Sequence, residues 1–192
     1  MLLCPFLMKF LCFILTLIFI NTAIAENFGS QTGLELPRYV SLKSNDSNIR
    51  VGPSKNYPIR IKYISENFPL KIVEEHNDWR RIIDYENNQG WIHKSLIKRQ
   101  RNAIIQSESN ETIYIFNIPD GKVIGEIDLK LIVNLDKCKL RWCLITKNNH
   151  KGWINKKYLW GVEKDEEFNI GILQKFVDYY FRSLNILEKL LQ

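Results

Sequence analysis

The sequence predicts an all-β protein with two small β-barrels in tandem, followed by a C-terminal amphipathic α-helix. Three observations carry this prediction. Residues 79–97 are echoed by residues 142–159, short stretches of alternating apolar and polar residues fill both halves of the chain, and apolar residues recur every three or four positions near the C-terminus. A repeat spaced by about sixty residues indicates one small unit that is built twice.

The repeated segment is typical of a β-hairpin in both halves. Residues 79–97 are WRRIIDYENNQGWIHKSLI, and residues 142–159 are WCLITKNNHKGWINKKYL. Each copy has a Trp, a short apolar run, a polar turn and then Gly-Trp-Ile. The turns are rich in Asn and Gly, which tolerate positive φ, so each segment predicts two paired strands.

A cysteine pair flanks residues 139–142, which fit the end of a β-hairpin. Cys138 and Cys143 are the two cysteines that remain once residues 1–25 are removed. Cross-strand neighbours lie about 4.5–5.5 Å apart at Cα, which suits a disulfide, and an oxidising compartment preserves one. Closing so small a loop should stabilise by roughly 2 kcal/mol. Aligning the two copies places Glu75 and Arg80 in the corresponding positions, where we expect an exposed ion pair.

Residues 1–25 have the pattern of a secretory signal peptide. A basic start at Lys9 precedes a short apolar core and the Ala-x-Ala site that ends at Ala25. We predict cleavage after Ala25 and a periplasmic or secreted protein without a stable membrane span; the alternative is a retained anchor, although the apolar core is short. Cleavage removes Lys9, so the net charge falls from +6 to +5. Outside the cytosol this charge favours anionic envelope polymers, or simple solubility, over nucleic acid.

The rest of the chain divides into four segments. They are a leader or linker at 26–38, a first module at 39–100, a second module at 101–162 and a helical tail at 163–192. Five short strands in about sixty residues fit a small closed or nearly closed barrel. The predicted strands are 48–51, 59–64, 70–73, 79–85 and 91–93 in the first module, and 112–116, 130–133, 142–146 and 153–154 in the second.

The tail is predicted to form the amphipathic helix. Its apolar residues share one face at helical spacing, while charged residues occupy the other. An isolated helix of this length is marginal in water, so its apolar face should be covered by the two modules, by a second copy through self-association, or by a membrane surface. The apolar positions are Ile172, Leu173, Phe176, Val177, Tyr180, Phe181, Leu184, Leu187 and Leu191.

The stretch Asn48-Ile49-Arg50-Val51-Gly52-Pro53-Ser54, followed by Tyr57-Pro58, Trp79 and Gly90-Trp91, resembles the bacterial Src-homology-3-like (SH3b-type) domain. Residues 33–43 also resemble the leader of a two-module envelope protein of this type. The resemblance implies small five-stranded barrels in an exported, non-catalytic binding or scaffolding protein, with relatives that contact peptidoglycan as parts of cell-wall hydrolases. The second module lacks the Asn-x-Arg-x-Gly-Pro-Ser stretch and keeps only the fold signals of this family.

Aromatic residues are the candidate ligand contacts, because aromatic faces bind sugar rings and Pro-rich peptides in shallow grooves. The alternative is that these rings pack in the barrel cores. Asn48 and Arg50 could bind a carboxylate, although we favour a role for Asn48 in fastening the adjacent turn. The candidate ligand-binding residues are Tyr57, Tyr63, Trp79, Trp91, Trp142 and Trp153.

The sequence predicts neither a catalytic site nor a cofactor. His76, His93 and His150 have no metal-ligand spacing, and no nucleophile elbow accompanies His93 and Ser95. The expected partner is a cell-wall component or a segment of an envelope protein. Two alternatives remain: a secreted protein–protein interaction factor that uses the tail helix, and an accessory subunit of a cell-wall hydrolase.

Overall fold

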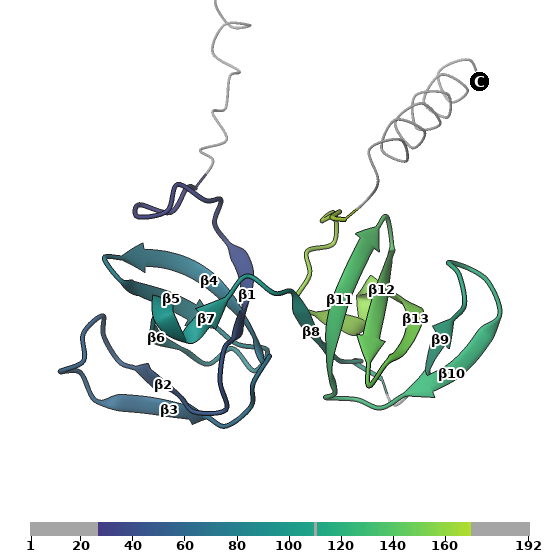
Figure 1. Cartoon of the computed structure of the whole chain (residues 1–192), viewed down its shortest axis with the longest axis horizontal. Coiled ribbons are helices and arrows are strands. Elements are labelled where there is room, and N and C mark those ends of the chain that lie inside the picture. Colours follow the sequence, from purple (N-terminus) through teal and green to yellow (C-terminus); the bar gives the residue numbers. More distant parts are fainter. Residues whose placement is uncertain (1–26, 110, 170–192) are drawn as a thin grey trace, which may run out of the picture.

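The computed structural model describes residues 27–109 and 111–169, and these residues form two separate antiparallel β-sheets (Figure 1). The strand order is β3-β2-β6-β5-β4-β1-β7 in the first sheet and β10-β9-β13-β12-β11-β8-β14 in the second, so the same topology occurs twice. We call β1–β7 the first module and β8–β14 the second module. The duplication that the sequence predicts is therefore present in the fold.

Each module contains a short 3₁₀ helix before its last strand, at Lys94–Leu96 and at Lys156–Tyr158. The strands of the first module are β1 (Arg38–Leu42), β2 (Ser47–Arg50), β3 (Ile59–Tyr63), β4 (Pro69–His76), β5 (Trp79–Ile83), β6 (Gln89–His93) and β7 (Ile97–Lys98). Those of the second module are β8 (Asn102–Ile105), β9 (Ile113–Phe116), β10 (Val123–Ile127), β11 (Ile132–Lys139), β12 (Trp142–Lys147), β13 (His150–Asn155) and β14 (Leu159–Trp160).

The sequence predicted five strands in the first module and four in the second, whereas each sheet has seven. The first and last strands were missed in both modules, and β10 was missed in the second. The strands β7 and β14 contain two residues each, too few for a periodic pattern, and Gly125 interrupts β10 at a register shift. The predicted signal peptide, residues 1–25, and the apolar positions of the predicted tail helix, residues 172–191, lie outside the described residues. Residues 163–169, which the prediction included in the helical tail, are not helical; Phe168 bridges to Cys138 there. Within the described ranges, no helix is long and apolar enough to cross a membrane.

The repeated Gly-Trp-Ile segment has a packing reason in each module. Gly90 and Gly152 occupy equivalent positions on β6 and β13, and a Cβ at either would overlap the side chain of Ile49 or Ile115 respectively. These isoleucines come from the equivalent strands β2 and β9 and are almost fully buried. The glycine therefore lets the neighbouring strand's isoleucine enter the core.

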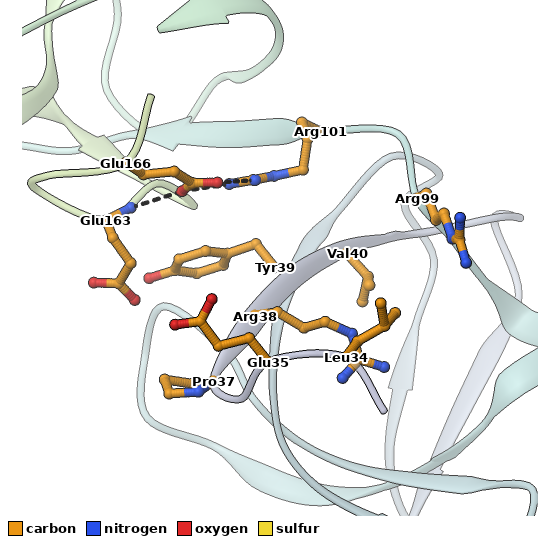
Figure 2. Close-up of a pocket in the computed structure, with 10 residues that line it drawn as sticks. All are labelled: Leu34, Glu35, Pro37, Arg38, Tyr39, Val40, Arg99, Arg101, Glu163 and Glu166. Atoms are coloured by element: carbon orange, nitrogen blue, oxygen red, sulfur yellow. Dashed lines mark hydrogen bonds and ion pairs between the residues drawn. The ribbon is translucent and has the colours of Figure 1, made fainter. Parts of the chain in front are cut away.

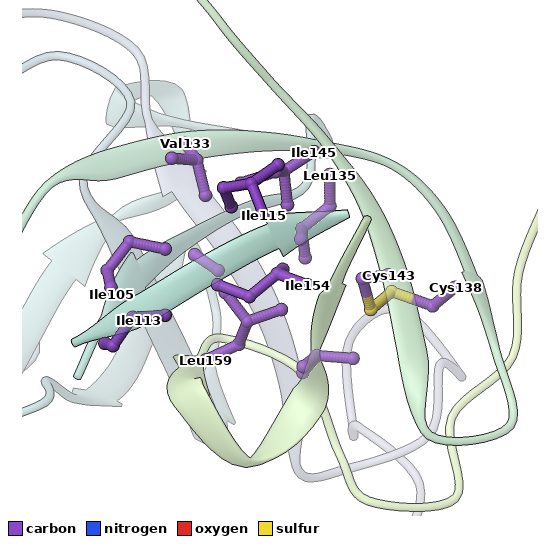
Figure 3. Packing of buried hydrophobic residues seen from close by; sticks show 12 residues of the cluster. Ile105, Ile113, Ile115, Val133, Leu135, Cys138, Cys143, Ile145, Ile154 and Leu159 are labelled. Carbon is purple, nitrogen blue, oxygen red and sulfur yellow. A yellow bond between two sulfur atoms is a disulfide. The ribbon is translucent and has the colours of Figure 1, made fainter. Parts of the chain in front are cut away.

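Each module has its own hydrophobic core (Figure 3 shows that of the second). Fully buried isoleucines from the central hairpin strands, Ile82 and Ile92, pack beside Leu42 and Leu70 in the first module. The core residues of the second module include Ile105, Ile113, Val133, Leu135, Ile145, Ile154 and Leu159, which pack beside Cys138 and Cys143.

The predicted hairpin register is confirmed. Glu75 pairs with Arg80 across β4 and β5, and Cys138 pairs with Cys143 across β11 and β12. A disulfide joins the two cysteines, whose Cα atoms are 4.1 Å apart. The expectation of an exposed ion pair was wrong, because Glu75 and Arg80 are 6% and 4% exposed.

The leader covers Glu75. Residues 27–36 fold back as a tight turn, in which Phe28 bridges to Glu35 and Leu36 N–H donates to Asn27. Gln31 N–H and Thr32 N–H each donate to the Glu75 carboxylate at 2.9 Å. Arg38 donates to the same carboxylate at 2.6 Å. The leader is therefore a folded part of the first module.

The two modules contact each other around Tyr39. Its ring meets Trp160 edge-on, with ring centroids 5.3 Å apart, and the cations of Lys71 and Arg101 lie over it. Lys71 of the first module pairs with Glu163, which follows the second module's last strand, at 2.6 Å. Only three residues, 99–101, connect β7 to β8.

Candidate binding surface on the first module

The outer side of the β4-β5-β6 sheet presents two tryptophans and two histidines. On β5 and β6, the inward positions are buried, while Trp79, Trp91 and His93 alternate with them and are half-exposed. In the register, Trp79 lies between His76 and His93. The Trp79 and His93 ring centroids are 5.4 Å apart, and those of His76 and Trp91 are 6.3 Å apart. We call these four residues the aromatic face.

An open hollow of about 450 Å³ adjoins this face. Trp79 and His93 supply its aromatic surface, and the loop between β2 and β3 and the turn between β4 and β5 supply the other lining residues. The hollow therefore combines an apolar ring surface with hydroxyl, amide, carboxylate and ammonium groups. Its lining residues are Pro53, Ser54, Lys55, Asn77, Asp78, Trp79 and His93.

The loop that closes the hollow is held by the residues of the Arg-x-Gly-Pro-Ser stretch. Arg50 donates to the Tyr57 carbonyl at 2.6 Å. A Cβ at Gly52 would come within 2.7 Å of the Tyr57 ring, so glycine is required for the ring to pack there. Arg50 therefore fastens the turn, a role that the sequence analysis assigned to Asn48. The Asn48 Oδ1 atom is buried and accepts no hydrogen bond from the described residues.

His93 and Asp78 have structural partners in addition to their place in the hollow. His93 Nδ1 accepts from the Ser95 N–H at 3.3 Å and so caps the 3₁₀ helix that begins at Lys94. The His93–Ser95 proximity is thus a helix cap. Lys94 donates to Asp78 at 2.8 Å, and this hydrogen bond, followed by the lysine charge, lowers the pKa of Asp78. Asp78 therefore presents an anionic carboxylate at neutral pH.

The candidate residues lie in different environments. Trp79 and Trp91 lie on the aromatic face, Tyr57 in the loop between β2 and β3 is 46% exposed, and Trp153 is half-exposed in the second module. Tyr63 and Trp142 are each only 8% exposed. The Tyr63 hydroxyl donates to Asp84 at 2.5 Å, and burial followed by this hydrogen bond raises the pKa of the phenol. We leave Tyr63 and Trp142 out of the proposed surface because they offer little area to a ligand.

Sequence reasoning missed the polar side of the hollow. Lys55, Asn77 and Asp78 lie in two loops that are distant in sequence, and only the paired strands bring them together. Among the described residues, no group of three or more His, Cys, Asp or Glu side chains is arranged to hold a metal ion.

The sequence profile of the bacterial SH3 domain matches residues 43–98 and 118–161, which together make up just over half of the chain. The chain belongs to the bacterial SH3 domain family. Both matched segments lie within the sheets described above, so each sheet is a bacterial SH3 domain. Among curated proteins, no sequence matches this chain.

Similar solved structures include larger proteins of the NlpC class. NlpC2 from Trichomonas vaginalis is 12% identical with a TM-score of 0.30, and the match covers 69% of this chain and 51% of that protein. An NlpC/P60 family protein from Bacillus cereus is 10% identical with a TM-score of 0.29, and the match covers 73% and 61%. This chain thus spans about half to three fifths of those proteins. At these scores the likeness carries no argument about activity.

The second SH3 domain has a different surface at the equivalent place. Phe116 takes the position of Arg50, because it pairs with Trp153 as Arg50 pairs with Trp91. Its ring meets Trp142 edge-on, with centroids 5.2 Å apart. The connection between β9 and β10 also lacks the Gly-Pro-Ser residues. The hollow beside the aromatic face therefore belongs to the first SH3 domain.

Proposed function

We propose that this chain is an extracytoplasmic, non-catalytic binding protein of the cell envelope. In this proposal the first SH3 domain recognises a cell-wall polymer, or a peptide segment of an envelope protein, through the aromatic face and its hollow. The second SH3 domain supports the first through the contact around Tyr39. The observation that carries the proposal is the hollow that Trp79 and His93 line together with Pro53 and Ser54 of the Gly-Pro-Ser stretch.

The chemistry of the hollow favours a ligand with both a flat apolar surface and several polar groups. A sugar ring or a peptide side chain can lie against Trp79, while Ser54, Asn77 and Asp78 provide hydrogen-bonding groups at the rim. The open shape favours modest affinity. The disulfide between Cys138 and Cys143 supports a location outside the cytosol, because such bonds persist in oxidising compartments.

Retention on purified peptidoglycan at low salt tests this proposal. We expect the purified protein to be retained, and Trp79→Ala to weaken retention at least about tenfold. Trp153→Ala is the matched control, because Trp153 is also half-exposed but lies in the domain that lacks the loop. Circular dichroism shows whether both variants are folded. Absence of retention, or equal effects of the two substitutions, would contradict the proposal.

A truncation separates wall binding from a partner-binding role for the tail. The cut belongs after Asn169, because residues before it are part of the fold: Phe168 bridges to Cys138, and Arg101 pairs with Glu166. We expect retention on peptidoglycan to survive removal of residues 170–192. Its loss in the folded truncated protein would favour the tail as the binding element.

A further inference from the structure

A second hollow lies between the two SH3 domains, separate from the aromatic face (Figure 2). Its volume is about 530 Å³. The walls come from the leader, from β1, from the three-residue connector and from the segment that follows β14. We call it the inter-domain cleft. It exists only because the two domains are held side by side.

The floor of the inter-domain cleft is apolar and well fixed. Val40 is 7% exposed, and Tyr39 is half-buried, with its ring held by the edge-on contact with Trp160. Leu34 and Pro37 extend this surface toward the leader. Burial, followed by the charges of Glu163 and Glu166, raises the pKa of Tyr39, so its phenol stays neutral. The floor can therefore take an uncharged chain segment.

The charges of the inter-domain cleft lie at opposite ends. Figure 2 shows the carboxylates of Glu35 and Glu163 beside Tyr39, whereas the guanidinium groups of Arg38 and Arg99 lie toward Val40 and Leu34. The end beside Tyr39 also holds Glu166 and two cations, because Lys71 pairs with Glu163 and Arg101 pairs with Glu166. Its three carboxylates outnumber these two cations, so this end has a net negative charge. At the other end Glu75 pairs with Arg38, and Arg99 supplies the positive charge.

Two charged side chains of the inter-domain cleft are available to bind a charged ligand. Glu35 and Arg99 are exposed, and neither side chain forms an ion pair within residues 27–109 and 111–169. Arg38 uses Nη2 on Glu75, while its Nη1 is buried without a partner among those residues. Guanidinium groups bind carboxylates well, and a pair of carboxylates favours an ammonium group.

From this arrangement we propose that the inter-domain cleft binds a short peptide that carries a free ammonium group at one end and a free carboxylate at the other. The ammonium group pairs with Glu35, beside the Glu163 carboxylate that Lys71 also contacts, the carboxylate lies against Arg99, and the chain crosses Tyr39 and Val40. Exposed charge pairs are individually weak, so binding requires both ends. This inference does not depend on the proposed role of the aromatic face.

Titration of the purified protein with oligoalanines of two to five residues, followed by backbone amide chemical shifts, tests the proposal. For at least one length, we expect the free peptide to shift the amides of Val40 and Arg101 and to bind at least about fivefold more tightly than its N-acetylated or C-amidated form. Blocking either end removes one of the two charge pairs. Equal binding of all forms, or no shift at Val40 and Arg101 at millimolar peptide, overturns the proposal.

Two charge-removing variants assign the ends. Glu35→Gln should bind the free and N-acetylated peptides equally, and Arg99→Gln should bind the free and C-amidated peptides equally. Glu108→Gln and Arg60→Gln are matched controls, because both side chains are exposed and lie outside the cleft. If the controls act as strongly as the cleft variants, the proposal fails. Trp79→Ala should leave peptide binding unchanged, so this result is read separately from retention on peptidoglycan.

Discussion

Replacement of Glu75 by Gln should destabilise the first SH3 domain severely. The Glu75 side chain has no exposed surface and sits 2.6 Å from Arg38 and 3.3 Å from the buried Arg80. It also accepts hydrogen bonds from the leader, including the Thr32 hydroxyl at 2.8 Å. Gln keeps the size of the side chain but removes its charge. Two enclosed guanidinium groups then lose their counter-charge.

The pKa of Glu75 gives the magnitude. Burial alone would raise it, but the hydrogen bonds from Arg38, Thr32 and Gln31 outweigh burial and lower it from 4.5 to about 2. At 1.36 kcal/mol per pH unit, this drop corresponds to about 3 kcal/mol of stability at neutral pH. Removing one partner of a buried ion pair costs about 3–5 kcal/mol in general. We therefore expect Glu75→Gln to lose about 3 kcal/mol.

The pH dependence has a definite sign. Because the folded pKa of Glu75 lies below its unfolded value, the contribution is complete above pH 4.5 and is lost as the pH falls toward 2. The free energies of unfolding of the wild type and of Glu75→Gln should therefore differ at pH 7 and converge near pH 2.

Urea unfolding followed by tryptophan fluorescence measures both effects. Glu74→Gln is the matched control, because Glu74 pairs with Arg81 at 3.0 Å but both side chains are almost half-exposed. This control should lose less than about 1 kcal/mol. The reasoning is refuted if Glu75→Gln loses no more than Glu74→Gln at pH 7, or if the gap from the wild type persists in full at pH 2.

Three further experiments test the second SH3 domain and the repeated glycine. Replacing Cys138 and Cys143 by Ser should lower the free energy of unfolding by about 2 kcal/mol in urea titrations; an unchanged midpoint would contradict this. Leu140 has φ = 50° and is 46% exposed, so Leu140→Asn should stabilise by about 0.5–1 kcal/mol, seen as a raised Tm. Gly90→Ala should cost about 1–3 kcal/mol because its Cβ would overlap Ile49, whereas Gly125→Ala meets open space and should be nearly neutral in the same thermal assay.

The central hairpins were predictable because the sequence marks both of their ends. Trp79 and Trp142 align the two copies, and this alignment placed Glu75 opposite Arg80 in the observed register. The burial of that pair was not predictable. In sequence, Glu and Arg at polar positions of neighbouring strands are typical of an exposed pair. The groups that cover Glu75 come instead from residues 31–38, which are 37–44 positions away in the chain, so no local pattern reveals the burial.

The aromatic face was also predictable in part, because the sequence shows the strand alternation and the loop that belong to it. Strand alternation puts Trp79 and Trp91 on one face, and the family stretch marks the loop that lines the hollow. Tyr63 looked equally suitable, but the end of β3 turns its ring inward toward Asp84, which follows β5. The hollow and the inter-domain cleft depend on loops meeting in space, for which no local pattern exists.

The slot that holds Glu75 and Arg80 in one half of the protein holds Cys138 and Cys143 in the other. The cross-strand links of the two halves are therefore sensitive to different chemical conditions. A reducing milieu opens the cross-link of the C-terminal half and leaves the salt bridge intact, while strong acid discharges the salt bridge and spares the sulfur bond. Neither condition breaks this cross-strand link in both domains, because the two aligned positions hold an ion pair in one domain and a disulfide in the other.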